Sequence, residues 1–182
     1  LSGTDASYFT INSSTGVLTL KASPDYETKT SYSITLKTSD DATIPKSYAE
    51  DFTISVSDVN EAPSFSSSSG TGSVAENADA STVIYTASAS DPDTTDSIVY
   101  SISGGDDASL VQIDSATGKV TLRDPADKET NPSIDFIVKA ADASDASLFA
   151  TQSVSVTVTE ENELPSASSQ IITLEENVTK TF

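Results

Sequence analysis

The chain has 182 residues, and its 28 acidic side chains against 9 basic ones give a formal net charge of −19. Such a charge disfavours nucleic acids and anionic membrane surfaces as partners, because both would be repelled. The sequence contains neither Cys nor His, so any bound metal must be held by oxygen atoms. No segment matches a membrane span of roughly 20 apolar residues, and we expect no membrane insertion.

From the first residues onward, the predicted elements occur twice. "FTINSSTGVLTL" (9–20) aligns with "VQIDSATGKVTL" (111–122) at a shift of 102 positions, and "SITLKTSDD" (33–41) aligns with "DFIVKAADA" (135–143) at the same shift. Several matches at one constant shift indicate a tandem array.

The predicted elements of the complete copy are short strands. Alternating apolar and polar residues predict, in chain order, strands over 81–89, 97–103, 119–122, 134–141 and 151–159. About seven short strands in about 100 residues are typical of an immunoglobulin-like sandwich, with an all-β barrel as the alternative. The predicted fold class is therefore all-β, with tandem immunoglobulin-like sandwiches of Greek-key topology.

The repeat divides the chain unevenly. We expect residues 1–63 to form a partial repeat without its first two strands, 64–165 a complete repeat, and 166–182 the first strand of a further repeat. Half a sandwich leaves strand edges unpaired. The missing strands lie upstream in a longer protein, or another chain supplies them.

Acidic residues recur near the boundaries between the repeats. Residues two apart in an extended segment point the same way, so Asp25 with Glu27, and Asp91 with Asp93, can each direct two carboxylates to one point. The pair Asp25 and Glu27 recurs at the repeat shift. The remaining candidates are Asp127, Glu129, Asp142, Glu76 and the linker residues Asp58, Asn60, Glu61, Glu160, Asn162 and Glu163.

These candidates are all oxygen donors. Ca²⁺ accepts six to eight oxygen ligands in irregular geometry, whereas Mg²⁺ requires a tighter octahedron and retains water. The pattern therefore favours a calcium site. The alternative is that each acid is a solvated turn residue, a position that Asp and Asn favour.

In their order along the chain, the motifs "VAEN", "DPD", "DKE", "AAD" and the linker "DVNEAP" resemble the calcium motifs of cadherin repeats. The resemblance implies that these motifs gather between successive sandwiches and bind up to three Ca²⁺ ions. For the first junction it implies Asp25, Glu27, Asp58, Asn60, Glu61, the carbonyl of Ala62, Asp91, Asp93 and Asp142. For the second junction it implies Glu76, Asp127, Glu129, Glu160, Asn162 and Glu163.

The resulting hypothesis is a non-enzymatic, calcium-rigidified repeat of an extracellular, cell-surface or secreted adhesin, with calcium ions and adjacent repeats as its partners. The abundance of Ser, Thr, Ala and Asp resembles the repeats of large bacterial adhesins. Two alternatives are a sandwich module that binds a carbohydrate or protein ligand, and assembly by strand exchange, in which residues 166–182 of one copy pair with the first repeat of another.

Overall fold

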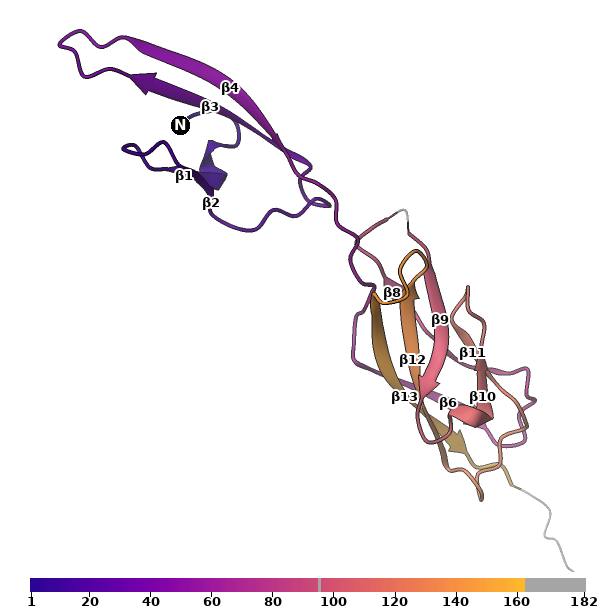
Figure 1. Cartoon of the computed structure of the whole chain (residues 1–182). Coiled ribbons are helices and arrows are strands. Elements are labelled where there is room, and N and C mark those ends of the chain that lie inside the picture. Colours follow the sequence, from indigo (N-terminus) through magenta and orange to yellow (C-terminus); the bar gives the residue numbers. More distant parts are fainter. Residues whose placement is uncertain (95, 163–182) are drawn as a thin grey trace, which may run out of the picture.

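The computed structural model describes residues 1–94 and 96–162, and this part of the chain forms two β-structured bodies placed end to end (Figure 1). The first body consists of two antiparallel hairpins, β1 with β2 and β3 with β4. Its elements are the short 3₁₀ turn η1 (Ala6–Tyr8), β1 (Phe9–Ile11), β2 (Leu18–Leu20), β3 (Ser31–Ser39) and β4 (Ser47–Ser55). No helix among the described residues is long and apolar enough to cross a membrane.

The second body is a two-sheet, immunoglobulin-like sandwich. One sheet has the order β6-β13-β12-β9 and the other has the order β10-β11-β7, and β5 pairs with β8 beside them. The elements are β5 (Ser64–Phe65), β6 (Ser69–Ala75), β7 (Val83–Thr86), β8 (Ala89–Ser90), β9 (Ile98–Gly104), the 3₁₀ turn η2 (Ala108–Leu110), β10 (Val111–Ile113), β11 (Lys119–Leu122), β12 (Ser133–Asp142) and β13 (Phe149–Thr159). The predicted all-β sandwich class is confirmed.

Alternation of buried and more exposed residues along most of β12 and β13 produces the core of the sandwich. Phe136, Val138, Val156 and Val158 are at most 1% exposed, while the residues between them face outward. They pack against apolar residues of the opposite sheet, including Val120 of β11. Burial of large apolar side chains on both inner faces is the main stabilising contribution.

The strand prediction omitted β6 and the short strands β5 and β10, and it treated 81–89 as one strand. The "SGTGSVA" sequence of β6 lacks apolar alternation, but its glycines are required, because a Cβ at Gly70 would lie 2.3 Å from Tyr85 Oη and one at Gly72 would lie 2.6 Å from the Ile84 carbonyl oxygen. The segment 81–89 divides because β7 pairs with β11 whereas β8 pairs with β5.

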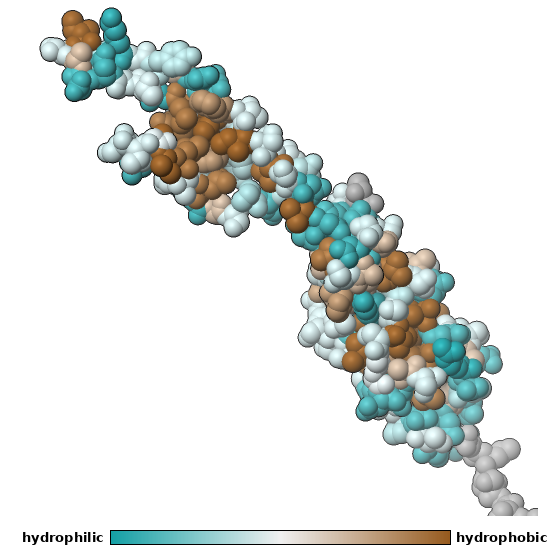
Figure 2. Space-filling view, viewed as in Figure 1, coloured by the Kyte–Doolittle hydropathy of each residue, from teal (hydrophilic) through white to brown (hydrophobic). Residues whose placement is uncertain are grey.

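The two bodies share their local structure but differ in how their cores are covered. Each contains a glycine at φ 102°, Gly3 in the first body and Gly105 in the sandwich, followed by a 3₁₀ turn and a hairpin. Val138 is 0% exposed in the sandwich, but Leu36 at the equivalent position of β3 is half-buried. In the first body, no described strand takes the place of β6 and β7. Its hairpins therefore present an apolar surface (Figure 2).

Candidate metal sites at the two ends of the sandwich

The first acidic cluster lies where the linker enters the sandwich. Glu27, Asp58, Glu61 and Asp93 each offer one carboxylate oxygen, and these four oxygens lie within 4.8 Å of one another. Glu27 comes from the loop after β2, Asp58 and Glu61 from the linker, and Asp93 from the loop after β8. The Glu61 N–H donates to Asp93 Oδ2 at 3.0 Å, and the Asp93 N–H donates to Asp91 Oδ1 at 3.0 Å. The first bond holds the linker against the sandwich, and the second fixes the turn that carries Asp91 and Asp93.

The carboxylates of this cluster repel one another, and this repulsion affects the pKa of Glu61. Burial and the nearby carboxylates of Glu27 and Asp93 raise the pKa of Glu61. Asp25 behaves differently, because the Thr28 N–H and hydroxyl donate to it at 3.0 and 2.9 Å and lower its pKa. Like charges near Glu61 oppose its ionisation, whereas hydrogen bonds stabilise the ionised form of Asp25.

A neighbouring group of acids surrounds the side-chain amide of Asn60. With its nitrogen turned toward them, this amide lies 3.1 Å from Asp93 Oδ2, 3.1 Å from Asp96 Oδ2 and 3.2 Å from Asp142 Oδ2. An amide has two hydrogens to donate, so three carboxylates exceed its capacity. Asp142 is 2% exposed, and its Oδ1 accepts from the Asp145 N–H at 2.8 Å.

Asp96 is a member of this group that the sequence analysis missed. The Asp96 N–H donates to the Asp93 carbonyl at 2.9 Å, and the resulting turn brings its carboxylate back toward Asn60. Burial, together with the charges of Asp142 and Asp93, raises the Asp96 pKa. The only signal in the sequence was a third acid in "DPDTTD".

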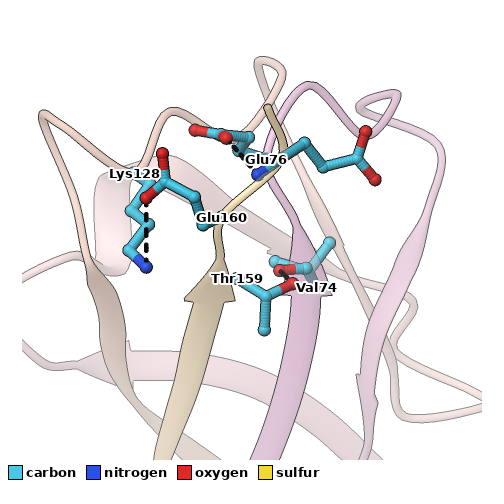
Figure 3. A network of polar contacts seen from close by, with 6 residues as sticks. Val74, Glu76, Lys128, Thr159 and Glu160 are labelled. Atoms are coloured by element: carbon cyan, nitrogen blue, oxygen red, sulfur yellow. Dashed lines mark hydrogen bonds and ion pairs between the residues drawn. The ribbon is translucent and has the colours of Figure 1, made fainter. Parts of the chain in front are cut away.

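The second cluster lies at the opposite end of the sandwich. One carboxylate oxygen each of Glu76, Glu129 and Glu160 lies within 4.8 Å of the others. Glu76 follows β6, is 2% exposed, and accepts a hydrogen bond from the Glu161 N–H through Oε1 (Figure 3). The parallel pairing of β6 with β13 brings Glu76 beside the start of the second linker, and the Thr159 hydroxyl donates to the Val74 carbonyl at 3.2 Å.

The remaining candidates are Asp127, which lies beside Glu129 of the second cluster, and the linker residues Ala62, Asn162 and Glu163. The Thr130 N–H and hydroxyl donate to Asp127 and lower its pKa, as Thr28 does for Asp25. Ala62 is half-buried and Asn162 is exposed. Glu163 lies outside the described residues.

The donor set and its unpaired atoms fit a hard divalent cation. Glu61 Oε2, Glu76 Oε2 and Asp91 Oδ2 are buried and accept no hydrogen bond. Burial of a carboxylate oxygen without a donor is costly, and calcium prefers carboxylate and amide oxygens. The fold and the clusters together define a class of protein, the immunoglobulin-like β-sandwich with acidic groups at both of its ends.

Comparison with known proteins identifies the family within this class. Residues 70–159 match the family model of the cadherin domain. This segment of the chain is therefore a cadherin domain.

Named relatives and solved structures agree with this assignment. The chain is 32% identical to mouse Protocadherin Fat 2 over 166 residues, which is 90% of this chain and 4% of that protein, and 34% identical to human Protocadherin Fat 4 over 146 residues, which is 79% of this chain and 3% of that protein. The structure of the extracellular cadherin domains 1–5 of Protocadherin Gamma B2 aligns with a TM-score of 0.67 and 31% identity, covering 85% of this chain and 32% of that one. These relatives are animal cadherins, so the expected bacterial origin is not supported.

Proposed function

We propose that this chain is a segment of an extracellular adhesion protein in which calcium ions at the repeat junctions hold successive sandwiches in one orientation. The observation that carries this proposal is the first cluster, whose four carboxylates come from the first body, the linker and the sandwich. A group that contacts all three segments at once couples their positions. The proposal includes repeat boundaries at residues 1–63, 64–165 and 166–182, and it assigns no catalytic role to the acids.

The charge of the junction supplies the physical reason. Without a counter-ion, the carboxylates of Glu27, Asp58, Glu61 and Asp93 repel one another and favour separation of the segments that carry them. A bound calcium ion supplies positive charge and accepts oxygen ligands from several segments. Asp93 and Asp91 are pre-positioned by the hydrogen bonds of the linker and the "DPD" turn. Binding only to the ordered junction also stabilises it by mass action.

Small-angle X-ray scattering with calcium and with chelator tests the proposal. We expect calcium to lengthen the particle and narrow its distribution of shapes. Glu61→Gln removes one carboxylate of the first cluster and should weaken the apparent calcium affinity about tenfold, since ligand charge sets affinity in such sites. Asp41→Asn is the matched control, because it removes the same charge in the exposed loop between β3 and β4. Scattering curves that superimpose in calcium and in chelator would refute the proposal.

Strand exchange is a second candidate, favoured by the apolar surface of the first body. Leu36 and Ile54 are half-buried there, while the equivalent Val138 and Val156 are 0% exposed. A second copy that adds strands over this surface would bury it. Sedimentation velocity at several concentrations tests this candidate, and a monomer at every concentration would exclude it.

A further inference from the structure

We propose that Lys128 is an internal counter-ion that lowers the calcium affinity of the second cluster, Glu76, Glu129 and Glu160, below that of the first cluster. This inference rests on the proposed function, because it concerns the relative affinities of the two sites. It predicts that the two junctions of one chain fill at different calcium concentrations.

The contact that supports it is an ion pair at the edge of the second cluster. Lys128 Nζ lies 3.3 Å from Glu160 Oε2 (Figure 3). Glu160 also offers an oxygen within 4.8 Å of those of Glu76 and Glu129. Lys128 stands between Asp127 and Glu129 in the loop that precedes β12. One carboxylate of the cluster is therefore shared between an ammonium group and any cation that the cluster binds.

The second cluster has an independent sign that it is a ligand site. Glu76 is 2% exposed, and its Oε2 is buried without a hydrogen-bond donor. The ammonium group of Lys128 contacts Glu160, whereas Glu76 Oε2 has no hydrogen-bond partner among the residues that the structure describes. Lys128 therefore neutralises part of the cluster's charge and leaves this buried oxygen available.

The first cluster supplies the comparison within the same chain. At the repeat shift of 102, Tyr26 stands where Lys128 stands, and Asp58 stands where Glu160 stands. In residues 1–94 and 96–162 the ion pairs are Lys29 with Asp5 and Lys128 with Glu160, so no basic side chain pairs with the first cluster. Within this described part of the chain, only the second cluster has a basic group in contact with one of its carboxylates.

The ion pair between Lys128 and Glu160 can alter calcium binding at the second cluster while contributing little to the stability of the fold. The side chains of Lys128 and Glu160 are 34% and 60% exposed, and ion pairs at such positions contribute little to stability. A unit positive charge a few ångströms from a divalent ion opposes binding even in high dielectric. Removing it should strengthen calcium binding by about tenfold.

A calcium titration followed by ¹H–¹⁵N NMR on the whole chain reads the two sites separately. The backbone amide of Glu161 reports on the second cluster and that of Glu61 on the first, because each donates to a carboxylate of its cluster. We expect Lys128→Gln to lower the apparent Kd at the second cluster about tenfold and to leave the first unchanged. Lys128→Arg keeps the charge and should bind as the unmodified chain does. Lys119→Gln removes a charge at the start of β11 and serves as the matched control.

A reciprocal variant tests whether adding a positive charge beside the first cluster weakens calcium binding there. Tyr26→Lys places an ammonium group beside the first cluster and should weaken that site by a similar factor. Equal Kd values at the second cluster in Lys128→Gln, Lys119→Gln and the unmodified chain would overturn the inference while leaving the proposed function intact. If the unmodified chain binds calcium at neither cluster, the proposed function fails, and the inference fails with it.

Discussion

The glycine at position 70 gives the most direct stability prediction, because the structure specifies what a larger side chain would meet. In Gly70→Ala the new Cβ would lie 2.3 Å from Tyr85 Oη and 2.6 Å from Tyr85 Cζ, well inside ordinary contact distance. The ring must move by about 1 Å, since ordinary carbon contacts lie near 3.5–4 Å. Tyr85 Oη donates to Gln152 Oε1 at 2.7 Å, and this displacement breaks that bond.

The magnitude follows from these two effects. Overpacking by one methyl group costs about 1–3 kcal/mol, and loss of a neutral hydrogen bond costs about 1 kcal/mol more. We expect Gly70→Ala to reduce the unfolding free energy of the sandwich by about 2–4 kcal/mol, which lowers the Tm of a domain of this size by roughly 10 °C or more. Circular dichroism during thermal and urea unfolding measures both quantities.

Two further variants separate this mechanism from a general effect of alanine in a strand. Gly104→Ala is the matched control, because its Cβ would meet only Ile137 Cδ1, at an ordinary 3.7 Å. Tyr85→Leu removes the ring, so adding it to Gly70→Ala should cost less than the sum of the single variants, by about 1–2 kcal/mol. If Gly70→Ala and Gly104→Ala have the same effect on stability, the steric reasoning is wrong.

Three other predictions follow from the core and the charges. Val138→Ala should cost about 1–3 kcal/mol in urea unfolding, and Leu36→Ala at the equivalent, half-covered position of the first body should cost clearly less; equal losses would contradict this. The Asp5 pKa is lowered, chiefly because the Ser33 N–H donates to its carboxylate at 2.7 Å. The stabilisation from ionised Asp5 is therefore fully present above the unfolded pKa near 3.8, and it is lost as the pH falls through the folded pKa. Asp5→Asn should flatten this acid limb in pH-dependent unfolding, and an unchanged limb would exclude the assignment. Glu61→Gln should raise Tm in chelator, where it relieves repulsion, and lower Tm in saturating calcium, and a shift of the same sign in both would be inconsistent with a metal site.

Local sequence patterns predicted the strands in which buried and exposed residues alternate. In β12 and β13, alternation with period two placed residues such as Phe136 and Val156 on the core face without knowledge of the partner strands. The shift of 102 likewise predicted a tandem repeat, and β3 and β12 begin at equivalent residues, Ser31 and Ser133. Glu27, Asp58, Glu61 and Asp93 were all named from motif spacing, and the structure brings their oxygens together.

The tertiary structure decided what depends on contacts between distant segments. The strand β6 carries almost no apolar signal, and it exists because Gly70 and Gly72 allow it to approach Tyr85 and the backbone of β7. The turn from Asp93 to Asp96 decides that Asp96 joins the Asn60 group. Alternation is a local property that can be read directly from consecutive residues. Close approach of backbones and pairing of charges depend on distances between segments far apart in the sequence, and those distances are set only when the chain has folded.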